Sequence, residues 1–120
     1  MNNKNFNLEE IYKIITDFRK KRDWEKFHNP KNLAISISLE ANELLEHFQW
    51  KSLEESLKYS KSNKDEISSE IADILAYILY LCNDLDIDIA EAIKKKIKEN
   101  EKKYPISKSK GNSKKYNQFK

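Results

Sequence analysis

The chain has 120 residues, of which 36% are charged and 38% hydrophobic, and its formal net charge is +3 at pH 7. This length fits one domain, and the single Gly and two Pro leave few turns for a sheet, so composition favours an all-α fold. A lone cysteine, Cys82, excludes an internal disulfide and indicates a buried thiol in a reducing compartment. The sequence shows no signal peptide or membrane-spanning stretch, so we expect a cytoplasmic protein without a membrane partner.

The first helix is expected to begin after Asn7, which forms a capping-box pattern with Glu10 and is followed by apolar residues at helical spacing. It should end where a connection begins at residues 22–30. This connection carries aromatic side chains where a plain linker would be rich in Gly, Ser or Pro, and it includes Trp24 and His28. Such residues fit either contact with a ligand or a plug at the end of a helical bundle.

A second helix is predicted to start at Pro30, with Asn29 as its N-cap, and to continue to about Trp50. Ser52 and Glu55 form another capping-box pattern, which predicts a short additional helix ending near residue 59. These two helices would be joined by a tight connection.

The polar run at residues 60–64 is predicted to be a loop before a third helix at residues 65–85. Apolar residues cover more than half of the circumference of that helix, so we expect it to be central and to meet another subunit in a homo-oligomer. Asp88 and Glu91 predict the cap of a fourth helix, and the basic tail at residues 106–120 is expected to be irregular unless a ligand or partner orders it.

Charge is segregated along the chain. Residues 32–50 and 65–93 hold eleven Asp and Glu and no Lys or Arg, whereas every basic residue lies outside these two segments. On a helical projection, the acidic residues of segment 32–50 form a stripe with apolar residues on both sides of it. The carboxylates of this stripe would therefore be partly buried. Ionised carboxylates removed from water need a cation or an elevated pKa.

Two pairs of carboxylates are spaced i,i+3, so each pair projects from one helix face: Glu40 with Glu43, and Glu70 with Asp73. If the second and third helices pack side by side, these four groups converge into a site that suits Mg²⁺ or Mn²⁺. One Cys and two His disfavour a zinc site. A solvated acidic face is the alternative, but the largely apolar, cation-free helices favour metal binding and chemistry on phosphates.

Lys96 and Asn100 lie one turn apart on the fourth helix and could reach anionic oxygens. A solvated lysine face is the more frequent explanation for such a run, so these two residues say little alone.

Five stretches of the sequence together resemble a known family: RDWEKFHNPKNL at 22–33, LEANELL at 39–45, FQWK at 48–51, EIAD at 70–73 and KYP at 103–105. The chain resembles the MazG-like nucleotide pyrophosphohydrolases and is most similar to their dCTP pyrophosphatase branch, over roughly residues 8–105. The tail sequence SKKY at 113–116 is also similar to that branch. Asn42 is a departure, since relatives often carry Gly between the two glutamates.

The resemblance implies a four-helix-bundle-like protomer with an additional short helix, assembled as a homodimer or a dimer-of-dimers tetramer. It implies a catalytic domain at residues 1–105 and a tail at 106–120 that is flexible or ordered over the site. The implied reaction is Mg²⁺-dependent hydrolysis of a nucleoside triphosphate, with dCTP or a modified dCTP favoured, to the monophosphate and pyrophosphate.

Residue roles follow from the same resemblance. Glu40, Glu43, Glu70 and Asp73 match the metal ligands, and Glu40 or Glu43 would also act as the general base. A further set matches positions near the base, sugar or phosphates of the substrate: Trp24, His28, Trp50, Tyr77, Lys96, Asn100 and Tyr104. Trp24 and Trp50 would stack on the base.

Two alternatives stay open. The first is a pyrophosphohydrolase for another nucleotide, such as dUTP or an oxidised triphosphate. The second is a non-catalytic helical oligomerisation module whose basic ends bind nucleic acid or a protein partner. If the protein is a nucleotide pyrophosphohydrolase, no nucleic-acid partner is expected.

Overall fold

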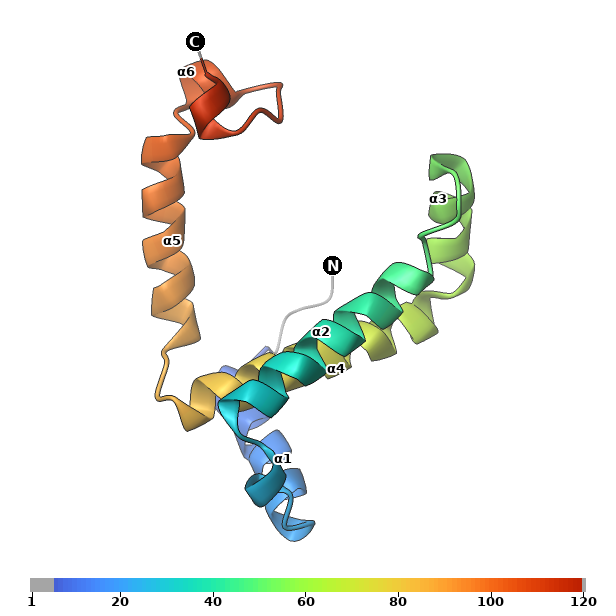
Figure 1. The fold of residues 1–120 in the computed structure, drawn as a ribbon, viewed down its shortest axis with the longest axis vertical. Coiled ribbons are helices and arrows are strands. Elements are labelled where there is room, and N and C mark those ends of the chain that lie inside the picture. Colours follow the sequence, from blue (N-terminus) through green and yellow to red (C-terminus); the bar gives the residue numbers. More distant parts are fainter. Residues whose placement is uncertain (1–5, 120) are drawn as a thin grey trace. The chain divides into compact units, whose positions relative to one another are not determined.

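The computed structural model describes residues 6–119, which form helices and no strand (Figure 1). The predicted all-α fold is therefore confirmed. The chain divides into two compact units, Met1–Leu85 and Asp86–Lys120, and each is described by itself. The predicted division between a domain at 1–105 and a tail stays a prediction. Among the described residues, none of the helices combines the length and apolar character needed to cross a membrane.

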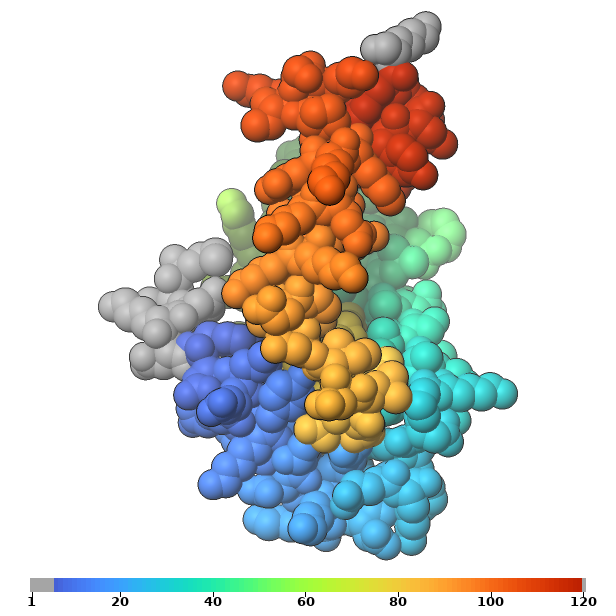
Figure 2. Space-filling view, turned by 90° about the vertical axis from the view of Figure 1, so that its left-hand side faces the viewer, coloured from blue at the N-terminus to red at the C-terminus, as the bar shows by residue number. Residues whose placement is uncertain are grey.

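Helix α1 (Leu8–Lys21) begins as predicted, since the backbone N–H of Glu10 donates to the side-chain oxygen of Asn7 at 3.2 Å. Asp23 follows the helix with a φ of 54°, a left-handed conformation that Asp tolerates better than most residues. A 3₁₀ turn, η1 (Glu25–Phe27), completes the connection. Figure 2 shows the blue atoms of α1 and the light-blue atoms of this connection as one continuous surface.

Helix α2 (Pro30–Glu46) begins as predicted, with the N–H of Asn32 donating to the side chain of Asn29 at 2.8 Å. The predicted end at Trp50 is wrong by four residues. The N–H of His47 bonds to the carbonyl of Leu44 at 3.3 Å, and similar i to i−3 bonds follow, so the α-helix tightens into turns before residue 50.

Helix α3 (Leu53–Ser62) carries the predicted capping box. The backbone N–H of Ser52 donates to the carboxylate of Glu55 at 3.0 Å, and the N–H of Glu55 donates to the hydroxyl of Ser52 at 3.1 Å. Both bonds satisfy donors that an uncapped helix start would leave free.

The predicted loop at residues 60–64 is wrong, because only Asn63 separates α3 from α4 (Lys64–Asp84). The hydroxyl of Ser60 donates to the carbonyl of Leu57 at 2.8 Å, and Ser62 bonds in the same way to the turn before it. Serines that would favour a loop are thereby accommodated inside a helix.

Helix α4 is central in the first unit, as predicted, because α1, α2 and α3 all pack against it. Helices α2 and α4 lie side by side over most of their length (Figure 1). The most buried apolar side chains are Leu33 of α2 and Leu79, Tyr80 and Cys82 of α4. Burial raises the pKa of the Cys82 thiol, which fits the prediction of an inert buried cysteine.

An ion pair that the sequence did not predict joins α1 to α4. The Arg19 guanidinium donates to both carboxylate oxygens of Asp84, at 2.8 and 2.7 Å, and the two side chains are 6% and 26% exposed. The guanidinium also lies 4.6 Å from the centroid of the Tyr80 ring, whose hydroxyl donates to the carbonyl of Ile15 at 2.7 Å. These contacts fix the angle at which α1 meets α4.

The second unit contains α5 (Ile89–Lys103), which Asp88 caps as predicted, by accepting from the N–H of Glu91 at 3.1 Å. The segment after it contains a short helix, α6 (Ile106–Ser109), and a 3₁₀ turn, η2 (Tyr116–Gln118). The rings of Tyr116 and Phe119 both pack edge-on against Tyr104, with centroid distances of 6.1 and 5.8 Å. The tail is thus less irregular than its composition predicted.

Candidate functional site

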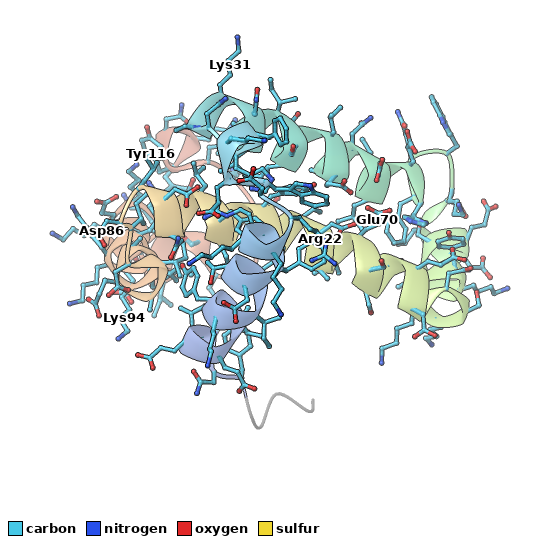
Figure 3. All side chains as sticks on the ribbon, turned by 90° about the horizontal axis from the view of Figure 1, so that it is seen from below. Arg22, Lys31, Glu70, Asp86, Lys94 and Tyr116 are labelled. Carbon is cyan, nitrogen blue, oxygen red and sulfur yellow. The ribbon has the colours of Figure 1, made fainter. Side chains whose placement is uncertain are left out.

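Three acidic side chains converge between α2 and α4. Glu40 and Glu43 of α2 and Glu70 of α4 each offer a carboxylate oxygen, and these oxygens all lie within 4.8 Å of one another. Figure 3 shows Glu70 on the side of α4 that faces α2. We call these three residues the carboxylate group. The structure therefore brings together three of the four predicted metal ligands, while Asp73 lies outside the group and lines a neighbouring pocket.

Negative charge in the carboxylate group is poorly compensated. Burial, then interactions with the carboxyls of Glu43 and Glu70 and the charge of Asp73, raise the pKa of Glu40 to about 7. One oxygen of Glu40 and one of Glu70, Oε2 in each, are buried and accept no hydrogen bond from the described residues. An ionised carboxylate that is buried without a partner costs roughly several kcal/mol of free energy. The carboxylate group therefore requires a proton or a cation.

The donor set fits a hard divalent cation. It consists of carboxylate oxygens alone, without His or Cys, and two of its oxygens are buried with no protein partner. Mg²⁺ and Mn²⁺ prefer such ligands and keep open positions for water and phosphate oxygens. Glu40, Glu43 and Glu70 would hold the ion, with Asp73 adding charge nearby.

Metal binding should release a proton, because Glu40 has to ionise to become a ligand. Its pKa of about 7 means that the metal-free protein is protonated at this site below neutral pH. Metal affinity should therefore rise by up to about tenfold per pH unit below 7 and level off above it. Calorimetric titration of Mn²⁺ in two buffers of different ionisation enthalpy measures the released proton. Glu40→Gln should abolish the buffer dependence, and a wild type without such dependence would contradict the prediction.

A pocket of about 350 Å³ lies beside the carboxylates, between α1, the connection after it and α4. We call it the aromatic pocket, because ring-bearing side chains dominate its lining: Phe18, Trp24, His28, Tyr77 and Tyr80. Three of the predicted substrate contacts thus share one pocket, and Asp73 joins it to the carboxylate group. The sequence assigned no role to Phe18 or Tyr80. Phe18 carries only the general signal of an apolar helix face, whereas Tyr80 follows Glu70, Asp73 and Tyr77 on one polar stripe at helical spacing.

His28 is placed to contact a ligand in this pocket. Its ring centroid lies 5.1 Å from that of Tyr80 and 6.2 Å from that of Tyr77. Burial and, secondly, the charge of Arg19 lower the pKa of His28, against an opposing effect of Asp84, so the imidazole is neutral at pH 7. Its buried Nδ1 has no hydrogen-bond partner among residues 6–119, so it is available to a polar ligand atom.

Four predicted substrate contacts are not brought into the aromatic pocket. Trp50 is 88% exposed in the turns after α2. Lys96, Asn100 and Tyr104 belong to the second unit, so their relation to the carboxylates stays a prediction.

A second pocket of about 460 Å³ lies on the other flank of the carboxylate group. We call it the charged pocket, and these residues line it: Glu43, Glu46, His47, Lys51, Tyr59 and Glu70. The sequence reasoning assigned no role to Lys51 or Tyr59. The signal was the motif FQWK at 48–51, which places a lysine directly after a segment without cations.

Comparison with known proteins places this arrangement in a family. The model of the MazG-like family matches residues 35–119, a range that includes all three residues of the carboxylate group. The chain belongs to the MazG-like family. The predicted resemblance is thereby confirmed.

Several relatives of this MazG-like protein have descriptive names. dCTP pyrophosphatase 1 of Bos taurus is 36% identical over 111 residues, covering 91% of this chain and 66% of the bovine protein. The human protein of the same name is 33% identical over 114 residues, covering 93% of this chain and 67% of its own. The chain therefore spans about two thirds of the length of these relatives. A pyrophosphatase crystal structure from Archaeoglobus fulgidus is 45% identical with a TM-score of 0.80, covering 88% of this chain and 98% of that one.

Proposed function

We propose that this MazG-like protein is a nucleoside triphosphate pyrophosphohydrolase that depends on a divalent metal, with Mg²⁺ preferred and Mn²⁺ as a substitute. The observation that carries the proposal is the carboxylate group, with its buried, unpaired oxygens, directly beside an aromatic pocket. This combination suits a ligand that joins an aromatic base to a metal-bound polyphosphate. The names of the relatives support the same chemistry.

The proposed reaction is attack of water on the α-phosphorus. A bond forms between the water oxygen and that phosphorus, and the bond to the oxygen that bridges to the β-phosphorus breaks. The electron pair leaves with pyrophosphate, and the water proton passes to a carboxylate, for which Glu40 and Glu43 are the candidates. A bound divalent ion supplies neutralisation of the phosphate charge. The products are a nucleoside monophosphate and pyrophosphate.

The favoured substrate is dCTP or a modified dCTP. In the proposed complex the base enters the aromatic pocket, where Trp24 stacks on it and Nδ1 of the neutral imidazole of His28 makes one hydrogen bond to its edge. The name dCTP pyrophosphatase 1 of the relatives supports cytosine as the base. Trp50 and Tyr104 are proposed as further contacts to the nucleoside, and Lys96 and Asn100 as contacts to the phosphates.

We further propose that the active form is a homodimer or homotetramer. Helices α2 and α4 leave large apolar side chains uncovered, with Leu39 60% and Ile71 51% exposed. Stretches of apolar surface of this kind usually mark an interface with another subunit. Sedimentation at micromolar concentration tests this, and a monomer throughout would contradict it.

Activity is tested by incubating the protein with each dNTP, dUTP and oxidised triphosphates in the presence of Mg²⁺ and separating the products. We expect equal amounts of monophosphate and pyrophosphate, highest with dCTP or a modified dCTP, and loss of turnover with a chelator. Preference for dUTP or an oxidised nucleotide would support the alternative substrates. Failure to release pyrophosphate from any nucleotide would exclude both enzyme proposals and favour a non-catalytic module.

A further inference from the structure

Lys51 is held in a fixed position in the charged pocket. Its ammonium donates to the carbonyl of His47 at 2.6 Å and lies 4.1 Å from the centroid of the Tyr59 ring. The Tyr59 hydroxyl is in turn 2.5 Å from Nδ1 of His47, which fixes that ring. A lysine on a protein surface loses rotamer freedom when it binds a ligand, and Lys51 has lost part of that freedom already.

Lys51 is also a cation that forms no close ion pair with a carboxylate among the described residues, and only its longer-range charge acts on the carboxylate of Glu55. Glu43 and Glu70 line the same pocket, yet none of the ion pairs among residues 6–119 includes Lys51. An ammonium has three N–H donors, and the His47 carbonyl uses one of them. The remaining donors can bind an anion that enters the charged pocket.

The two pockets follow one another along α4. Glu70 lines the charged pocket, whereas Asp73 and Tyr77 line the aromatic pocket farther along the helix. A helix rises about 1.5 Å per residue, so Glu70 and Tyr77 are separated by roughly 10 Å along its axis. Two members of the carboxylate group, Glu43 and Glu70, line the charged pocket, and the charge of the third, Glu40, acts on Tyr77 of the aromatic pocket. A nucleotide with its base in the aromatic pocket and its phosphates at the carboxylates would therefore direct its terminal phosphates toward the charged pocket.

We propose that Lys51 binds the β- and γ-phosphates of the substrate, the part that leaves as pyrophosphate. This inference rests on the proposed function. Lys51 then supplies, from the same subunit and unit as the carboxylates, positive charge at the end of the polyphosphate. The competing role is purely structural, because the bond to the His47 carbonyl also caps the C-terminus of α2.

The test compares inhibition by the two products. Lys51→Gln removes the charge but keeps an N–H donor for the His47 carbonyl, and Lys51→Arg keeps the charge. We expect Lys51→Gln to raise the inhibition constant of pyrophosphate about tenfold, as for one lost charged contact, and that of the nucleoside monophosphate less than about twofold. Lys51→Arg should recover most of the pyrophosphate binding. Lys58→Met, which changes an exposed lysine of α3, is the matched control and should alter neither constant.

Two outcomes would overturn the inference: unchanged pyrophosphate inhibition in Lys51→Gln, or equal weakening of both products, which indicates a structural cap alone. If Lys51→Gln does not fold, two other variants are compared instead: Lys51→Arg, which keeps the charge, and Lys51→Met, which removes it. The inhibition constants of pyrophosphate and of the monophosphate are judged by the same criteria. If the wild type cleaves no triphosphate, the proposed function fails. Calorimetric titration of magnesium pyrophosphate into the wild type and Lys51→Gln then decides the role of Lys51 separately, because equal affinity would exclude it.

Discussion

Glu70→Gln is expected to lower kcat/KM about 10³-fold while the protein stays folded. Gln has the shape of Glu, but it is a poor ligand for Mg²⁺ because it carries no negative charge. The buried, unpaired Oε2 of Glu70 is part of the carboxylate group, so the loss should correspond to roughly 4 kcal/mol of transition-state stabilisation. Steady-state kinetics with dCTP measure the loss of kcat/KM, and calorimetric titration of Mn²⁺ measures the weaker metal binding.

The stability of the same variant should move in the opposite direction. In the metal-free protein the pKa of Glu40 is raised by burial first and then by hydrogen bonds with the carboxyls of Glu43 and Glu70. The amide oxygen of Gln at position 70 can accept the same bond without adding a second acidic group. We therefore expect a thermal midpoint equal to or above that of the metal-free wild type, as is common when a strained functional site is neutralised.

Glu66→Gln is the matched control. Glu66 is an exposed residue of α4, like Glu70 a glutamate, but it lies outside the carboxylate group and lines neither the aromatic nor the charged pocket, so its replacement should change kcat/KM by less than about threefold. Near-normal turnover in folded Glu70→Gln would refute the metal site. A loss in Glu66→Gln as large as in Glu70→Gln would show that negative charge on α4 matters, and position in the carboxylate group does not.

Local spacing in the sequence predicted that carboxylates of α2 and α4 converge, because helical period is a local property. Glu40 and Glu43 had to share one face of α2, and the wide apolar surface of α4 made its packing against α2 predictable. Three of the four predicted ligands converge for this reason. The exact distance of Asp73 from the others depends on how two helices are rotated about their axes, which spacing along one helix does not specify.

Long-range pairs could not be predicted in the same way. Arg19 and Asp84 are separated by 65 positions, and Arg19 stands beside Lys20 and Lys21 in a basic run that reads as solvated surface. Similarly, Lys51 enters the charged pocket because α2 ends earlier than predicted and the following turns bring it back to His47. Both features follow from tertiary packing.

Arg19→Met is expected to lower the free energy of unfolding by about 2 kcal/mol, because it leaves the carboxylate of Asp84, whose side chain is only 26% exposed, without its partner. The pH dependence has a defined sign. The hydrogen bonds from Arg19 lower the pKa of Asp84, so the pair stabilises the protein above the unfolded pKa of about 3.9 and this stability is lost as pH falls through the lower folded value. Urea unfolding of wild type and variant at several pH values should show a difference that is full at pH 6–7 and shrinks toward strongly acidic pH.

Controls separate this pair from surface charge in general. Lys58→Met removes a cation whose pair with Glu54 is 3.7 Å long and over 80% exposed on both sides, so its effect should stay below about 0.5 kcal/mol. The double variant Arg19→Met with Asp84→Leu removes both charges and should recover part of the loss, since no buried charge is then left unpaired. If Arg19→Met cost no more than Lys58→Met, or if its cost did not depend on pH, the ion pair would not be what holds α1 against α4. In that case the hydrogen bond from the Tyr80 hydroxyl to the carbonyl of Ile15, which stays in place, would have to carry the attachment.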